Sequence, residues 1–359
     1  MTAPASPAFS TDDFASALLV WFDLHGRKDL PWQHQRTPYR VWLSEVMLQQ
    51  TQVRTVIPYF ERFIDALPNL AALASAPQDR VLALWSGLGY YSRARNLQRA
   101  AQICIEQHQG ELPRNVDALS ALPGIGRSTA AAILAQAFGE RHAILDGNVR
   151  RAFARWHGVH GWPGSTAAQR LLWQYAEAHT PVERVADYTQ AIMDLGATLC
   201  TRSRPHCTRC PVADGCVALR AGLTDVLPEA KPRRASPLRA TTMLIVRDGD
   251  GRILLERRPP TGVWASLWSL PEVDDTAIAT TRLRDRYAAR AAAPMELERF
   301  VHTFSHYRLD VTPLLFDTAV RESRIADDPD HGWYSRAEWP ALGLPAPVRK
   351  LLEKLEEPR

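Results

Sequence analysis

The sequence predicts two domains of different fold class, an all-α domain followed by a smaller α+β domain. Apolar residues recur at helical spacing from about residue 12 to residue 219. Three prolines and three basic residues then crowd into residues 224–237, a composition typical of an extended linker. Beyond the linker, apolar and polar residues alternate with the period of a β-strand. With 359 residues, the chain is long enough for each domain to have its own core.

The N-terminal domain, predicted over residues 1–222, is divided into helices by prolines. Leu18, Leu19 and Phe22 share one helical face, as expected for a helix packed on a core. Proline lacks a backbone N–H and ends or interrupts a helix, so helices of ordinary length are expected between these residues. The breaks fall at Pro31, Pro68, Pro77, Pro113, Pro123 and Pro163.

The C-terminal domain is predicted over residues 238–359, after a linker at residues 223–237. The run Asp248-Gly249-Asp250-Gly251 is a strong hairpin signal between strands at residues 241–246 and 252–256. Further strands are predicted over residues 300–303 and 308–316, and a terminal helix over residues 348–355.

Composition and charge set only broad limits on function. Hydrophobic residues make up 46% and charged residues 23% of the chain, the balance of a globular protein rather than a disordered one. No run of 18 apolar residues predicts a membrane span, and no secretion signal is recognised, so we expect a cytoplasmic protein. The net charge of +4 permits a nucleic-acid partner without indicating one.

Four of the five cysteines predict a metal centre. Cys200, Cys207, Cys210 and Cys216 lie within 17 residues, spaced C-x6-C-x2-C-x5-C, whereas Cys104 is expected to be a buried apolar residue. Structural zinc usually takes two tight Cys-x-x-Cys pairs, and only one is present. The spacing therefore favours a [4Fe–4S] cluster, with zinc as the alternative. The nearby residues Arg202, Arg204 and Arg209 would either face a polyanion or offset the charge of the cluster.

A turn between two predicted helices has the composition of a phosphate-binding hairpin. In Leu122-Pro123-Gly124-Ile125-Gly126, Gly124 and Gly126 permit positive φ and close backbone approach. The helix that follows would start with free N–H groups that can bind phosphate. By itself, this turn could equally be an ordinary helix–helix connection.

Several motifs together resemble a known family. Leu122–Gly126, then Leu145-Asp146-Gly147-Asn148-Val149, and then the four-cysteine loop resemble the helix-hairpin-helix glycosylases of the endonuclease III superfamily, over about residues 15–220. Within it, residues 42–51 and 87–93 are similar to the MutY-type adenine glycosylases. The resemblance implies a catalytic domain with an iron–sulfur loop, and a Nudix-like C-terminal domain that recognises 8-oxoguanine.

Two carboxylates could break an N-glycosidic bond, a reaction that needs a proton donor and an anion beside the cationic sugar. Glu45 lies among apolar helix residues, where desolvation would raise its pKa, although an exposed helical position is the alternative. Asp146 fits a helix N-cap as well as a carboxylate that faces the sugar. The resemblance implies that Glu45 protonates adenine at N7 and that Asp146 stabilises the sugar cation.

Position 128 bears on the type of glycosylase. Bifunctional relatives place here a lysine that forms a Schiff base with the sugar, whereas this chain has Ser128. The sequence therefore predicts a monofunctional enzyme, with water as the final nucleophile and Ser128 left to contact DNA or to position that water.

The resemblance also implies the DNA contacts. Adenine must leave the base stack to reach the acid. Family analogy inserts Gln49, Gln50 and Thr51 into the gap and places Tyr90 beside the oxidised guanine. The remaining expected DNA contacts are Leu88, Leu122, Gly124, Gly126, Ser128 and Asn148, and Arg27, Trp32 and Asp194 are expected to line the base pocket.

The C-terminal domain is expected to recognise rather than hydrolyse. Phe304-Ser305-His306 resembles the loop with which the family senses 8-oxoguanine. The segment after Leu270-Pro271-Glu272 lacks the glutamate-rich helix with which Nudix hydrolases bind Mg²⁺.

The predicted partner is double-stranded DNA containing an A:8-oxoguanine or A:G mispair, bound by a monomer. Two alternatives remain: a bifunctional pyrimidine glycosylase and lyase, and a non-catalytic DNA-binding module with a redox-active cluster.

Overall fold

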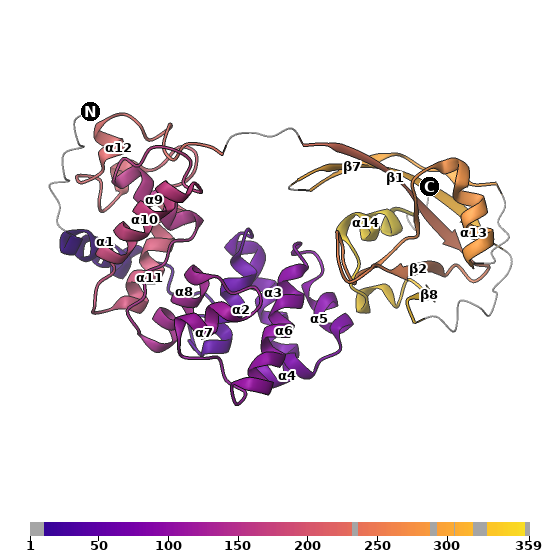
Figure 1. Cartoon of the computed structure of the whole chain (residues 1–359), viewed down its shortest axis with the longest axis horizontal. Coiled ribbons are helices and arrows are strands. Elements are labelled where there is room, and N and C mark those ends of the chain that lie inside the picture. Colours follow the sequence, from indigo (N-terminus) through magenta and orange to yellow (C-terminus); the bar gives the residue numbers. More distant parts are fainter. Residues whose placement is uncertain (1–10, 232–235, 288–292, 305, 319–328, 356–359) are drawn as a thin grey trace. The chain divides into compact units, whose positions relative to one another are not determined.

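The computed structural model describes residues 11–231, 236–287, 293–304, 306–318 and 329–355. Figure 1 shows its elements, which form two compact units. The first unit, called here the helical unit, comprises residues up to Ser75 and from Arg99 to Arg233. The second, called the sheet unit, comprises residues 76–98 and those from Arg234 onward. Residues 76–98 thus belong by their contacts to the sheet unit, although they precede the linker in sequence.

The predicted all-α region is confirmed, and its helix ends follow local sequence signals. Helix α2 begins at Pro38 after Thr37, whose side chain accepts a hydrogen bond from the backbone N–H of Arg40. Helix α8 ends at Gly139, which has a left-handed conformation with φ of +69°. The helices are α1 (Thr11–His25), α2 (Pro38–Leu48), α3 (Val53–Ala66), α4 (Leu70–Ser75), α5 (Gln78–Trp85), α6 (Ser92–Gln107), α7 (Val116–Ala121), α8 (Arg127–Phe138), α9 (Gly147–Trp156), α10 (Thr166–His179), α11 (Val185–Asp194) and α12 (Val217–Arg220).

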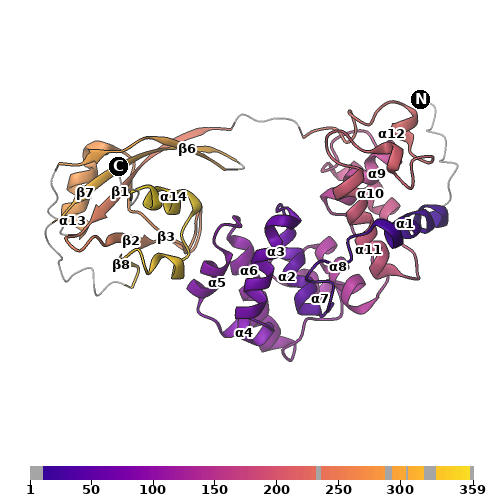
Figure 2. The same ribbon diagram turned by 180° about the vertical axis from the view of Figure 1, so that it is seen from behind.

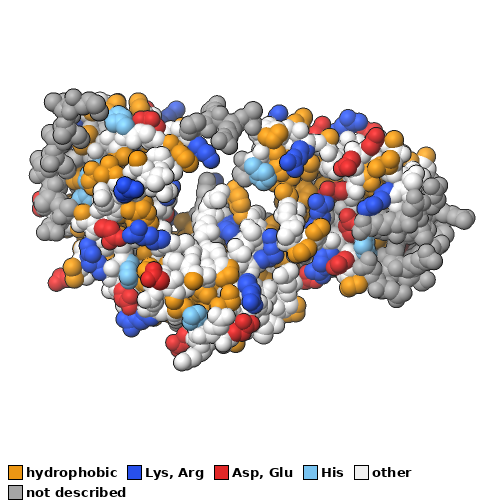
Figure 3. Space-filling model, viewed as in Figure 1, with side chains coloured by type: hydrophobic (Ala, Val, Ile, Leu, Met, Phe, Trp, Pro, Cys, Tyr) orange, Lys and Arg blue, Asp and Glu red, His pale blue; other side chains and the backbone are white. Residues whose placement is uncertain are grey.

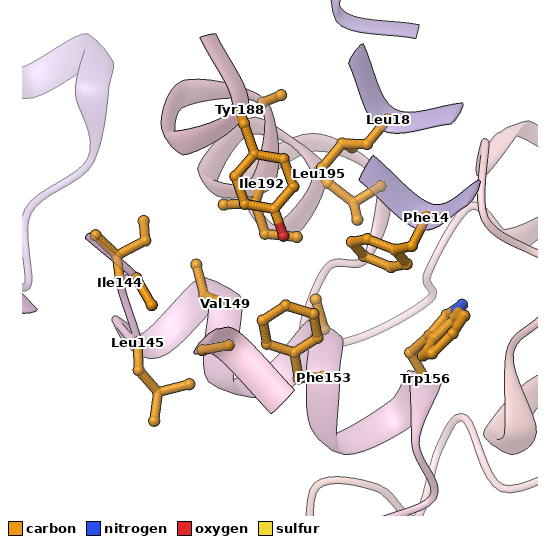
Figure 4. Close-up of a cluster of buried hydrophobic side chains, with 14 of the residues drawn as sticks. Phe14, Leu18, Ile144, Leu145, Val149, Phe153, Trp156, Tyr188, Ile192 and Leu195 are labelled. Atoms are coloured by element: carbon orange, nitrogen blue, oxygen red, sulfur yellow. The ribbon is translucent and has the colours of Figure 1, made fainter. Parts of the chain in front are cut away.

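A buried apolar cluster holds the N- and C-terminal helices of the helical unit together. Figure 4 shows side chains of α1, α9 and α11 pointing toward one another, with Phe14, Phe153 and Ile192 among them. The ring centroids of Phe14 and Trp156 lie 5.0 Å apart, edge to face. This cluster joins residues more than 130 positions apart and fixes α9 against the helix that ends at Asp194.

A π-helical turn at Leu195–Leu199 follows α11 directly. It packs against the start of α9, where a Cβ at Gly196 would lie 2.5 Å from the Cβ of Asn148. Only glycine permits this approach, so the turn holds the end of α11 close to the Asp146–Asn148 segment.

The sheet unit contains a mixed sheet, and strands lie where they were expected, although residues 243–246 of β1 are continuously apolar rather than alternating. Strand β1 pairs with β2 in the predicted hairpin and with β7 in parallel, in register from Leu238 opposite Arg308 to Arg247 opposite Asp317. The sheet order is β3-β2-β1-β7-β5, with β4 also on β1, β6 on β7 and β8 on β2. The strands are β1 (Leu238–Arg247), β2 (Ile253–Arg257), β3 (Trp268–Ser269), β4 (Glu272–Val273), β5 (Met295–Glu296), β6 (Phe300–Thr303), β7 (Arg308–Asp317) and β8 (His331–Tyr334).

Both faces of this sheet are covered. Met243 and Ile245 of β1 belong to one buried cluster, which includes Val348 of helix α14 (Ala346–Leu355). Their neighbours Leu244 and Val246 belong to a second cluster, with residues of helix α13 (Ala279–Tyr287). Figure 2 shows both helices beside the sheet, seen from behind. Burial on both faces explains the continuous apolar run in β1.

The surface carries charges of both signs. On the face shown in Figure 3, lysine and arginine side chains lie beside acidic ones. Within the described residues, no helix has the length and hydropathy needed to cross a bilayer.

Candidate active site

Glu45 lies on α2 in an environment that favours its neutral form. The helix buries Trp42, Leu43 and Met47, which leaves the Glu45 carboxyl half-buried beside an apolar face. Burial, reinforced by the nearby negative charge of Asp146, raises the pKa of Glu45 to about 7, and a hydrogen bond from Gln136 opposes the rise. Glu45 is therefore half-buried rather than at an exposed helix position.

Asp146 caps α9 and lies close enough for its charge to act on Glu45. Its Oδ1 accepts a hydrogen bond of 2.7 Å from the backbone N–H of Val149, so the N-cap interpretation is confirmed. Burial raises the pKa of Asp146, while hydrogen bonds from Val149 and Asn148 lower it. The cap fixes the orientation of the carboxylate. The structure thus brings together two carboxylates that are 101 residues apart.

Two of the residues expected in the base pocket are bonded to each other. Asp194, whose side chain is 1% exposed, accepts hydrogen bonds from the Arg27 backbone N–H (2.8 Å), Nε (2.9 Å) and Nη2 (2.6 Å). Gln190 Nε2 adds a fourth bond, of 2.7 Å, to Asp194 Oδ1. Trp32, the third residue, is buried, and its ring packs edge-on against Phe60 at 5.4 Å. Asp194 is therefore held by a network that joins the end of α11 to the segment after α1.

The residues expected to enter the DNA gap lie at the C-terminal end of α2. Gln50 is exposed and has a φ of +59°, a conformation that non-glycine residues rarely adopt. Gln49 Nε2 lies 3.5 Å from Thr129 Oγ1 of α8, and Thr51 Oγ1 donates to the Gln49 carbonyl at 3.4 Å. The turn is thus anchored to the start of α8 and presents Gln50 outward.

The hairpin between α7 and α8 has the positive φ that glycine permits at Gly124 but not at Gly126, whose φ is −92°. Leu122 and Ile125 are buried, whereas Gly124, with φ of +78°, and Gly126 are exposed. Gly126 is the N-cap of α8, and no side chain of the described residues caps this helix. The first turn of α8 therefore offers uncapped N–H groups at an exposed helix start.

Ser128 and Asn148 connect this region to the Asp146 loop. Ser128 Oγ accepts a hydrogen bond of 2.9 Å from the backbone N–H of Leu145, next to Asp146. Asn148 Oδ1 accepts one of 2.9 Å from Arg151 Nη2. Both side chains support the position of Asp146.

In the sheet unit, two residues that follow Tyr90 in the chain hold its loop by hydrogen bonds. Tyr90 has a φ of +49° and is 48% exposed, whereas its neighbour Leu88 is buried. Tyr91 Oη donates to the Leu344 carbonyl at 2.9 Å, and Arg95 Nη1 donates to the Ala265 carbonyl at 2.6 Å. These bonds fix the loop and leave the Tyr90 ring accessible.

Aromatic side chains surround the expected guanine-sensing loop. Ser305 lies outside the described residues. The rings of Phe304 and Trp264 lie 5.3 Å apart, and those of Phe304 and His306 6.3 Å apart. Trp264, which sequence reasoning missed, has a φ of +57°. Its only sequence signal is its place next to glycine-containing turn residues at 259–262.

The four predicted ligand cysteines line one pocket of the helical unit. Cys200, Cys207, Cys210 and Cys216 surround it with apolar neighbours, and Cys104 is fully buried elsewhere, as predicted. Burial raises the pKa of Cys210 to about 12 and also raises those of Cys207 and Cys216. Four thiolates can therefore coexist here only when positive charge compensates them.

Four thiols around one pocket are a donor set that fits an iron–sulfur cluster. Among the described residues, no three histidine, cysteine or acidic side chains converge to hold one metal ion. A cubane instead takes one thiolate at each of its irons, so its ligands stand further apart. Arg155, a buried residue of α9, donates to Cys200 Sγ at 3.4 Å and to the Thr201 carbonyl at 2.7 Å. Its guanidinium thus places a positive charge beside the cysteine thiols.

Sequence reasoning missed two further polar residues of the site. Gln136 Nε2 donates to Glu45 Oε1 at 3.0 Å, and Gln190 holds Asp194. The only available signal for Gln136 was a single amide in the otherwise apolar run of α8, residues 130–138.

Comparison with known proteins agrees with this geometry. Residues 43–178 match the HhH-GPD superfamily base excision DNA repair protein family, and residues 242–354 match the NUDIX domain family. The chain is 34% identical to the adenine DNA glycosylase of Buchnera aphidicola subsp. Acyrthosiphon pisum, over 96% of this chain and 98% of that protein. It is 36% identical to the human adenine DNA glycosylase, over 82% of this chain and 65% of that protein.

Two solved structures resemble more than half of the chain. A thermostable thymine-DNA glycosylase, 28% identical, covers 58% of this chain and 95% of its own, with a TM-score of 0.53. Endonuclease III from a non-covalent DNA complex, 23% identical, has the same fold over 58% of this chain and 95% of its own, with a TM-score of 0.50.

Proposed function

The chain belongs to the adenine DNA glycosylases, and from that premise we propose that it hydrolyses the N-glycosidic bond of adenine mispaired with 8-oxoguanine or guanine in base excision repair. The observation that carries the proposal is the pair of half-buried carboxylates, Glu45 and Asp146, from α2 and the start of α9. We further propose that it acts in the cytoplasm, on DNA, as a monomer.

Glu45 is the general acid. Its pKa of about 7 leaves it partly protonated at neutral pH, so it can give a proton to N7 of the flipped adenine. Protonation makes adenine a better leaving group, and the C1′–N9 bond breaks with its electron pair going to the base. The carboxylate that remains can take a proton from the water that then attacks C1′.

Asp146 is the anion beside the developing sugar cation. The N–H groups of Val149 and Asn148 stabilise its charged form and hold it in place. When two carboxyl groups lie near each other, ionisation of one disfavours ionisation of the other. One therefore serves as the acid and the other as the anion. Here the hydrogen bonds favour Asp146 as the anion, while burial and then the charge of Asp146 raise the pKa of Glu45 to about 7.

The reaction ends without a lyase step. Ser128 occupies the position of the Schiff-base lysine in bifunctional relatives, and its Oγ is engaged with the Leu145 N–H. No amine is therefore available there for imine formation. The product is an abasic site in an intact strand.

Cys200, Cys207, Cys210 and Cys216 would hold a [4Fe–4S] cluster. Such a cluster would supply cross-links within the loop at residues 200–216. Arg155, which donates to Cys200 Sγ, would offset its negative charge.

The DNA contacts divide between the two units. In the helical unit, the exposed start of α8 at Gly124 and Gly126 binds backbone phosphate, and Gln50 with its neighbours Gln49 and Thr51 fills the gap left by adenine. In the sheet unit, Tyr90 and the loop of Phe304 and His306 contact the oxidised guanine. These assignments rest on exposure and on the family resemblance.

The test is single-turnover cleavage of a duplex with adenine opposite 8-oxoguanine, comparing the wild-type chain with Glu45→Gln. We expect adenine release that is lost in the variant and a strand that breaks only after alkali. A thymine glycol duplex and borohydride trapping run in parallel. Strand scission with a trapped adduct would instead show a bifunctional lyase, and binding without base release would show a DNA-binding module.

A further inference from the structure

Gln136 is a buried amide directed at the proposed acid. It lies near the end of α8, is 5% exposed, and follows a run of buried alanine, isoleucine and leucine residues at 130–135. Its Nε2 donates a hydrogen bond of 3.0 Å to Glu45 Oε1. Helices α2 and α8 pack against each other, so both side chains are held by regular structure. An amide in such a position is costly unless its partner is present.

We infer that Gln136 is a positioning residue that holds the Glu45 carboxyl through both of its protonation states, an inference that rests on the proposed role of Glu45 as the acid. An amide carries both a donor and an acceptor and does not itself titrate. Its N–H binds the carboxylate, and after rotation of the amide its carbonyl accepts the O–H of the protonated acid. The bond to the carboxylate is charge-assisted and therefore the stronger of the two, so the amide orients both states but on balance favours the ionised one. A carboxyl oriented in both states can deliver a proton and then receive one without reorienting.

The surroundings of Glu45 determine in which direction its pKa moves when Gln136 is replaced. Burial and the charge of Asp146 both raise its pKa, and the Gln136 hydrogen bond lowers it. Removing the amide leaves only the two raising influences. The pKa of Glu45 should then move further up, so the acid is weaker and also less well oriented.

The experiment measures the pH profile of single-turnover adenine release by the full chain, from the duplex with adenine opposite 8-oxoguanine. The variant Gln136→Met keeps the length of the side chain and removes the hydrogen bond. We expect the alkaline limb to move up by about one pH unit, the size of one charge-assisted hydrogen bond. We expect the plateau rate to fall roughly tenfold, because an oriented proton donor is lost.

Gln98→Met is the matched control. Gln98 is a buried glutamine of similar exposure, 4%, whose Nε2 donates to the Ala76 carbonyl at 2.7 Å. This variant carries a comparable packing cost and should keep the wild-type alkaline limb. Gln136→Leu serves as a second variant if the methionine variant does not fold.

The outcomes separate the inference from the proposed function. An upward displacement of the limb in the Gln136 variants alone supports the inference. The inference is overturned if the alkaline limb of the Gln136 variants does not move, whatever their plateau rate. It is also overturned if Gln98→Met shows the same displacement. If the wild-type chain releases no adenine at any pH, the proposed function fails, independently of Gln136.

Discussion

Loss of the Arg27 guanidinium should strongly destabilise the helical unit. Asp194 is 1% exposed, and Arg27 supplies three of the four hydrogen bonds described for its carboxylate. In Arg27→Ala the backbone N–H and Gln190 remain, but the compensating charge disappears. Breaking one side of a buried ion pair costs about 3–5 kcal/mol. Because the Arg27 side chain is 27% exposed and two donors remain, we expect about 3 kcal/mol.

The chain provides an exposed pair of similar geometry as a control. Arg184 Nη2 lies 2.6 Å from Asp23 Oδ1, as short as the Arg27–Asp194 contact, but its side chain is 44% exposed. Solvent screens such a pair, so Arg184→Ala should leave the unfolding midpoint nearly unchanged.

Urea unfolding followed by circular dichroism measures both variants. The double variant Arg27→Met with Asp194→Leu removes the buried charge together with its partner and should recover much of the lost stability. Two results would contradict this reasoning: Arg27→Ala lowers the free energy of unfolding by less than about 1 kcal/mol, or by no more than Arg184→Ala does. Either would show that the burial of the Asp194 charge does not determine the stability of the helical unit.

Three other predictions concern the acid, the core and the cysteine loop. Because Glu45 must be protonated and its pKa is raised to about 7, adenine release should level off at acid pH and fall about tenfold per pH unit well above the pKa. A rate that is flat through neutral pH would contradict this. The Tyr188 hydroxyl is buried with no hydrogen-bond partner among the described residues (its ring is in Figure 4), so Tyr188→Phe should raise the free energy of unfolding by about 1 kcal/mol. A less stable variant would show that the hydroxyl is satisfied. Cys210→Ser should lower iron content, visible absorbance and melting temperature together, and an unchanged iron content would remove Cys210 from the ligand set.

Sequence patterns were enough to predict the elements and several site residues. Helical spacing, prolines and the Asp248–Gly251 turn depend on neighbours a few positions apart, so the all-α region and the hairpin were predictable. The four cysteines lie in one short segment, which made their shared site predictable. The N-cap at Asp146 is equally local, since its acceptor reaches only to Val149.

The sequence by itself therefore determined the two fold classes, the helix ends and the candidate carboxylates and thiols, because those signals act over a few residues. Only the tertiary structure decided the through-space pairs. Arg27 and Asp194 are 167 positions apart, and Gln136 and Glu45 are 91 apart. The ten-residue parallel pairing of β1 with β7 likewise has no local signal. Such pairs depend on how whole helices and strands pack, and it is this packing that raises the pKa of Glu45 and surrounds the Asp194 carboxylate with hydrogen-bond donors.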